Sequence, residues 1–69
     1  MLKMNDTIKD LQTGREYIVE GLYIGIDSIG FDFLAKWKTT NIIDPHGNKV
    51  YGNRGFLLKD KGSKWIKIK

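Results

Sequence analysis

The sequence predicts an all-β fold, in which five short antiparallel strands close into a small barrel. Sixty-nine residues suffice for one domain, so residues 1–69 are expected to fold as a single unit. Turn signals rich in Gly, Asp and Asn recur at the spacing that short strands require. The runs between them are rich in Tyr, Ile and Val, and one of them alternates with period two. The chain is therefore expected to be a series of hairpins.

The N-terminal segment is the only place where a helical turn is expected. Asn5 or Asp6 can serve as an N-cap for the residues after it. Ile8 and Leu11 stand three residues apart, which places them on one face of a helix. Residues 5–12 are therefore expected to form at most one short helical turn, or a loop.

Residues 15–26 predict the first long strand, and its alternation changes phase at Gly21. Tyr17 and Val19 point to one face, and Leu22 would then point to the opposite one. A β-bulge inserts one residue and restores the alternation. We therefore expect a bulge or a sharp bend at Gly21, which also lets a long strand curl in a small barrel.

Residues 31–38 follow a turn at residues 27–30 and alternate apolar with polar side chains. This alternation predicts a buried face. Its members are Phe31, Phe33, Ala35 and Trp37.

A tight hairpin is expected between a third strand at residues 39–44 and a fourth at residues 49–53. In the turn between them, Pro45 presets its own φ and Gly47 takes the left-handed conformation.

The last strand is expected at residues 64–69, after a turn at residues 60–63. Its alternation separates two sets of side chains, and we expect Ile66 and Ile68 to point inward. Trp65 then points outward among the neighbouring lysines, or it covers one open end of the barrel.

In Gly14–Val19 a turn glycine precedes an aromatic-x-Val pair, and this segment resembles the opening strand of the SH3-like barrel superfamily. Ile42–Asn48 resembles its distal hairpin, and Phe56 stands near a short connecting turn after the fourth strand, as in that superfamily. The resemblance covers most of the chain and implies an SH3-like barrel. An OB-like barrel is a second architecture that fits the pattern.

Charge is divided unequally along the chain. Residues 1–35 hold three Lys or Arg against six Asp or Glu, whereas residues 36–69 hold nine against two. A surface that binds single-stranded nucleic acid needs lysines interleaved with aromatic rings, because the cations bind phosphates and the rings stack on bases. The candidate binding residues are Lys36, Lys38, Lys49, Tyr51, Arg54, Lys64, Trp65, Lys67 and Lys69.

Other interpretations of the same lysines stay open. Lysines on exposed strands protect sheet edges from aggregation, and this role needs no ligand. A basic surface also fits an acidic protein, and a free sheet edge accepts a strand from a partner. We therefore expect a non-enzymatic binding module, in the first place a sequence-tolerant nucleic-acid-binding protein. The alternative is a small protein–protein interaction module or a host-modulating factor of bacterial or phage origin. A chain this small without disulfides also favours self-association.

No residue pattern predicts catalysis, a metal site or a cofactor. The chain has no Cys, and its single His, His46, falls in the expected turn, where Asp44 already serves turn formation. Asp27 and Asp32 flank another turn, where carboxylates are usually solvated. The cysteine-free composition favours a cytoplasmic protein, and no apolar run is long enough to cross a membrane. Ten Lys against two Arg, with nine Ile, are typical of an AT-rich bacterial or phage genome.

Overall fold

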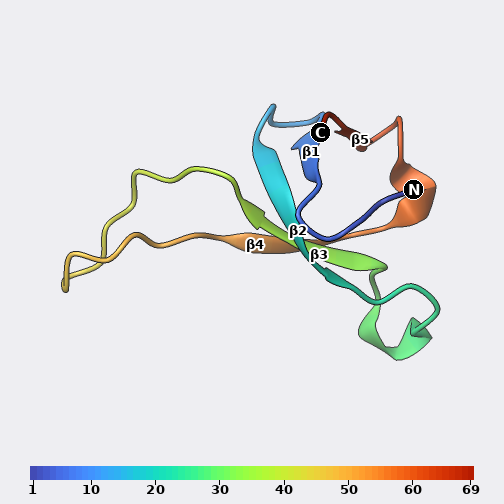
Figure 1. The fold of residues 1–69 in the computed structure, drawn as a ribbon, viewed down its shortest axis with the longest axis horizontal. Coiled ribbons are helices and arrows are strands. Elements are labelled where there is room, and N and C mark those ends of the chain that lie inside the picture. Colours follow the sequence, from blue (N-terminus) through green and yellow to red (C-terminus); the bar gives the residue numbers. More distant parts are fainter.

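Five short strands form one antiparallel sheet that curls into a half-barrel in the computed structural model, which describes all of residues 1–69 (Figure 1). The order across the sheet is β4-β3-β2-β1-β5, so β4 and β5 are its two edges. The all-β prediction is confirmed, since the only helical segments are two 3₁₀ turns. The strands are β1 (Thr7–Asp10), β2 (Glu16–Leu22), β3 (Phe33–Trp37), β4 (Asn53–Phe56) and β5 (Trp65–Lys67), and the turns are η1 (Asp27–Ile29) and η2 (Leu58–Asp60).

Strand β1 lies where the sequence predicts a helical turn, so that prediction is wrong. Ile8 pairs with Tyr17 of β2 on one side and with Lys67 of β5 on the other. Ile8 is fully buried, and Asp10 points to the same face two residues later. An extended β1 offers its backbone N–H and C=O groups to the strands on both sides. A single helical turn in this place could not bond both strands.

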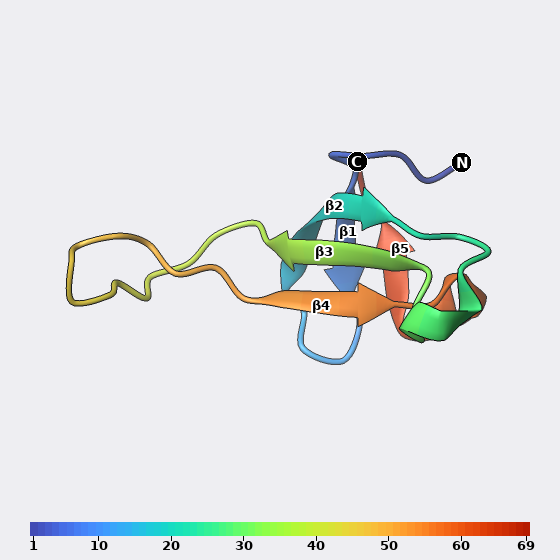
Figure 2. The same ribbon diagram turned by 90° about the horizontal axis from the view of Figure 1, so that it is seen from below.

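Strand β2 is bulged next to Gly21, as predicted. Val19 stands opposite Ala35, but the next paired residue is Gly21 opposite Leu34, so Glu20 is the extra residue. Leu22 therefore returns to the face of Val19, and it stands opposite the buried Phe33. The bulge lets β2 curl around the interior (Figure 2).

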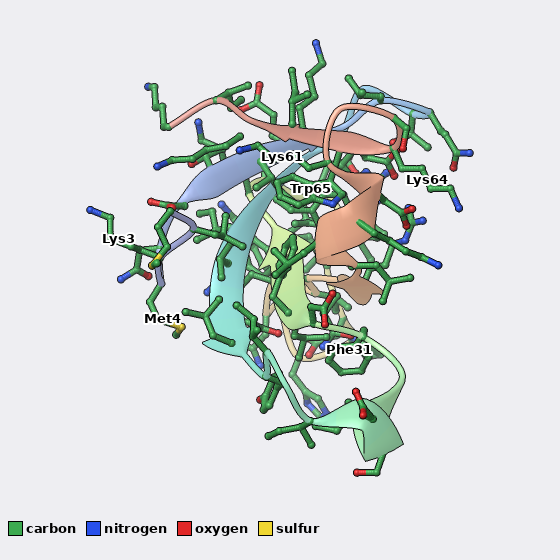
Figure 3. The ribbon with its side chains drawn as sticks, turned by 90° about the vertical axis from the view of Figure 1, so that its right-hand side faces the viewer. Lys3, Met4, Phe31, Lys61, Lys64 and Trp65 are labelled. Atoms are coloured by element: carbon green, nitrogen blue, oxygen red, sulfur yellow. The ribbon has the colours of Figure 1, made fainter.

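Trp65 belongs to the interior, and the prediction of an outward Trp65 is wrong. Because β5 pairs with β1 in the register Asp10 to Trp65, the ring enters the concave side of the sheet (Figure 3). It lies edge-on to Phe33 at 5.0 Å, and its Nε1 donates a hydrogen bond of 2.8 Å to the Leu57 carbonyl. The buried apolar side chains are Ile8, Tyr17, Val19, Phe33, Ala35, Phe56 and Trp65.

The inward prediction for Ile66 and Ile68 is also wrong. With Trp65 inside, the alternation of β5 turns Ile66 toward the convex side, where it is half-buried. Ile68 follows the end of β5 and is 40% exposed.

On the convex side, aromatic rings cover two glycines that flank Leu34. Leu34 pairs with Gly21 on β2 and with Gly55 on β4. A Cβ on Gly21 would lie 2.7 Å from the Tyr23 ring, and one on Gly55 would lie 2.5 Å from Phe31. The two rings meet edge to face at 5.8 Å. Glycine at both positions is therefore a packing requirement, because any side chain would displace a ring.

Residues 38–52 form a long arm that projects from one end of the half-barrel (Figures 1 and 2). The two strands predicted at residues 39–44 and 49–53 are wrong here. The arm contains only an isolated bridge between Ile43 and Lys49, and regular pairing starts again at Asn53. No helix in the structure has the length and apolar character needed to span a membrane.

Candidate functional site

The arm exposes four apolar side chains, which we call the apolar cluster. Ile42, Ile43, Val50 and Tyr51 are between 41% and 53% exposed, and all four stand near the isolated bridge. Apolar side chains gathered on one protruding element, rather than scattered singly, are typical of an interaction surface. The arm is therefore the first candidate for a functional site.

A local network holds the tip of the arm. Asp44 Oδ1 accepts hydrogen bonds from the backbone N–H of His46 at 2.9 Å and of Asn48 at 2.8 Å. Gly47 adopts φ 84° and donates its N–H to the Asp44 carbonyl at 3.0 Å, so the predicted turn is confirmed. Both hydrogen bonds end on Oδ1 of Asp44, which therefore serves the turn.

The two limbs of the arm are held together by few bonds. Val50 N–H donates to the Ile42 carbonyl at 2.9 Å, and Asp44 N–H donates to the Asn48 carbonyl at 2.8 Å. A two-stranded ribbon with no sheet or helix packed on its face is marginally stable in water. A partner that covers the apolar cluster would stabilise the arm.

A groove of about 750 Å³ opens at the base of the arm, lined by residues 13–16 and 37–42. Trp37 is half-buried there, and its ring has two close neighbours. The Arg15 guanidinium carbon lies 4.0 Å from the ring centre, and a Cβ on Gly52 would come within 2.5 Å of the ring. Trp37 therefore joins the arm to the half-barrel.

Four of the residues proposed from the sequence gather at or near the arm. Lys36 Nζ lies 5.9 Å from the centre of the Tyr51 ring, a distance typical of a weak cation–π contact. Lys49 precedes Tyr51 by two residues on the same limb. Lys38 begins the other limb, where its Nζ lies 3.3 Å from Glu16 Oε1.

The remaining five lie away from the arm. Lys64 Nζ is 3.9 Å from Asp60 and Lys67 Nζ is 3.3 Å from Asp6, so two of these cations face carboxylates. Lys69 lies beside β1, where its backbone exchanges two hydrogen bonds with the backbone of Thr7. Arg54 points into the concave side, where its guanidinium lies 2.6 Å from Asp10. Trp65 is buried.

Asp6 is the acceptor that holds Lys67. The backbone N–H of Lys3 donates to its carboxylate at 2.7 Å, and this bond is the main reason why the pKa of Asp6 lies below its ordinary value of 3.8. The hydrogen bond and charge of Lys67 lower the pKa further, against partial desolvation. Asp6 therefore ties the N-terminal segment to β5 through a carboxylate that stays ionised in mild acid.

Sequence reasoning missed the three aliphatic members of the apolar cluster, Ile42, Ile43 and Val50. Their β-branched side chains predict strands, and the structure leaves them extended but outside the sheet. The available signal was the run of apolar residues directly beside a polar tight turn, with no alternation to mark a buried face.

No three side chains of His, Cys, Asp or Glu lie close enough together to hold a metal ion. The chain matches no protein-family model, and neither a curated protein nor a solved structure shows significant similarity to it.

Proposed function

We propose that this protein is a non-enzymatic binding module whose arm recognises an acidic and partly apolar surface of another protein. The observation that carries the proposal is the exposed cluster of Ile42, Ile43, Val50 and Tyr51 on an arm that the barrel does not cover. The half-barrel then serves as the scaffold. Its bulged second strand also favours the finer assignment to the SH3-like kind.

Charge around the cluster favours an acidic partner. Lys49 lies within the arm and Lys36 at its base, and neither forms an ion pair. Asp44 is the only carboxylate of the arm, and its Oδ1 is bonded within the turn. Apolar contact would supply most of the affinity, and the two lysines would steer the partner and set its orientation.

Nucleic acid is the second candidate ligand. It is favoured by Lys36 beside the exposed ring of Tyr51, since a base can stack on that ring while the lysine meets a phosphate. Few of the expected side chains are left to bind nucleic acid, however. Trp65 is buried, and four of the cations face carboxylates: Lys38, Arg54, Lys64 and Lys67.

Affinity capture from extracts of the source cells, with two matched variants, tests the proposal. Ile43→Asp places a charge in the cluster, and Ile68→Asp makes the same change at an exposed position outside the arm. We expect the wild type and Ile68→Asp to capture the same protein and Ile43→Asp to lose it. The captured protein, once purified, should then bind directly with the same ranking. Equal binding by all three chains would refute the role of the arm.

Binding to labelled single- and double-stranded oligonucleotides at increasing salt tests the second candidate. A nucleic-acid ligand predicts binding that weakens steeply with salt and falls when Tyr51 is changed to Ala. Lack of binding at low salt excludes it.

A further inference from the structure

The loop at the end of the molecule opposite to the arm carries carboxylates and no cation. Residues 22–32 contain no Lys or Arg and hold two carboxylates. The segment that joins β2 to β3 lies at this end, far from the arm along the longest dimension of 38 Å (Figures 1 and 2). We call residues 22–32 the acidic loop. Its carboxylates are Asp27 and Asp32, and Glu20 precedes it in the bulge of β2.

The acidic loop is also apolar and exposed. Leu22, Ile24, Ile26 and Ile29 are between 37% and 54% exposed, so this loop forms a second apolar cluster of similar size to that of the arm. The molecule therefore carries two exposed apolar clusters, one bordered by lysines and one by carboxylates.

A shallow hollow of about 190 Å³ lies in the acidic loop. Its apolar lining consists of Ile26, Phe31 and Leu57, and Asp27 and Asp32 stand at its border. Asp32 accepts a hydrogen bond from the backbone N–H of Leu58 at 2.7 Å, which fixes its carboxylate. Asp27 is exposed and forms no ion pair, so its charge is available to a cation from outside.

We propose that the acidic loop of a second copy of this chain is a partner surface for the arm. This rests on the function proposed above and names one surface of the chemistry that it requires. An apolar cluster with free lysines would meet an apolar hollow bordered by carboxylates. The arm cannot reach the acidic loop of its own chain, because the half-barrel lies between them (Figure 2).

Two copies that lie antiparallel bring each arm to the acidic loop of the other, so the contact is made twice. This is the reciprocal pattern of a two-fold dimer, in which each contact is repeated by symmetry. The apolar surface buried in this way would supplement a core of only seven buried apolar side chains. Small domains without disulfides commonly gain stability by such association.

Reciprocal charge exchange tests the contact. Lys49→Glu reverses a charge on the arm, and Asp27→Lys reverses one on the acidic loop. Both residues are exposed and neither side chain has a partner within its own chain, so the fold is retained. Lys69→Glu makes the same charge change as Lys49→Glu outside both surfaces. Sedimentation equilibrium over a wide concentration range measures the molecular mass of each chain in solution and so its self-association.

We expect the wild type and Lys69→Glu to self-associate and each exchange variant alone to do so roughly tenfold more weakly, because like charges meet at both contacts. An equal mixture of the two variants restores association, since the glutamate introduced at position 49 then meets the lysine introduced at position 27, and the reciprocal contact is unchanged. A wild-type chain that stays monomeric overturns the inference, as does a mixture that gains nothing or a Lys69→Glu variant as weak as Lys49→Glu.

Failure of this inference is distinguishable from failure of the proposed function. A monomeric chain that captures another protein, and loses it with Ile43→Asp, keeps the arm as the recognition element and excludes only the second copy. If the Ile43→Asp chain captures the same protein as the wild type, the arm is not the recognition element.

Discussion

Arg54 of β4 donates a 2.6 Å hydrogen bond to Asp10 of β1, across the concave side of the sheet. The two strands are not neighbours in the sheet, so this ion pair ties an edge strand over the interior. The Asp10 side chain is 1% exposed and that of Arg54 is 43% exposed. The guanidinium also lies 4.9 Å from the centre of the Phe56 ring.

Arg54→Met should lower the free energy of unfolding by about 2 kcal/mol, because it leaves a buried carboxylate without its cation. The cost is below that of a fully buried pair, since water reaches the arginine. In an Asp10→Asn background the same change should cost less than about 1 kcal/mol, because no charge is stranded. Urea unfolding of the four chains measures the difference, and equal costs in both backgrounds would contradict the pairing.

Trp65→Phe should lower Tm by about 5–15 °C. The variant loses ring volume beside Phe33 and leaves the Leu57 carbonyl without the donor that holds it. Ile68→Ala removes an exposed side chain from the same end of the sequence and should change stability by less than about 0.5 kcal/mol. Thermal unfolding followed by circular dichroism compares them. A Trp65→Phe variant as stable as Ile68→Ala would place the indole at the surface.

Gly55→Ala should cost about 1–3 kcal/mol, because its Cβ would lie 2.5 Å from Phe31 Cγ. In a Phe31→Ala background the ring is gone and only the contact with the Cβ of residue 31, at 2.9 Å, is left. The cost should therefore be clearly smaller than in the wild type. Chemical unfolding of the four chains of this cycle gives the coupling, and strictly additive effects would show that the ring does not require the glycine.

Asp6 predicts a pH dependence of stability in the acid range. Its pKa is lower in the folded chain than the ordinary value of 3.8, so the ionised form stabilises the fold. This contribution is fully present above pH 3.8 and is lost as the pH falls through the lower pKa of the folded chain. The wild type should therefore exceed Asp6→Asn in stability at neutral pH, and the two should converge in strong acid. Urea unfolding from neutral pH down to strong acid checks this, and a gap that persists in strong acid would exclude the charge as its cause.

The sheet could be predicted in outline because its strongest signals are local. The alternation of Phe33 and Ala35 marks the core face of β3, and the phase change at Gly21 marks the bulge of β2. The turn at Asp44 and Gly47 follows from residue types alone. Each of these features depends on side chains only a few residues apart.

The N-terminal strand was missed because its burial depends on distant partners. Asp10 occupies an inward position and is stabilised by Arg54, 44 residues later in the sequence. A polar residue at such a position removes the apolar alternation that identifies a strand, and the spacing of Ile8 and Leu11 fits a helix equally well. Only the pairing with β2 and β5 decides between them.

The candidate site was predicted in part. Lys36 and Tyr51 do come together. Trp65 was assigned to the surface because Ile66 and Ile68 alternate with it in the sequence and were expected to face inward. Either set can face inward in such a strand. The pairing of Trp65 with Asp10 places the indole inside. Periodicity gives the two faces of a strand, whereas the assembled sheet decides which face is buried.

Amide hydrogen exchange of the intact chain, measured when dilute and when concentrated, tests most directly whether the arm is a recognition element for a second copy. We expect amides of residues 42–50 to exchange quickly when dilute and to slow on concentration, together with those of residues 23–32, while β1, β2 and β3 do not change. Equal exchange in the arm at both concentrations, or slowing confined to another surface, would contradict it.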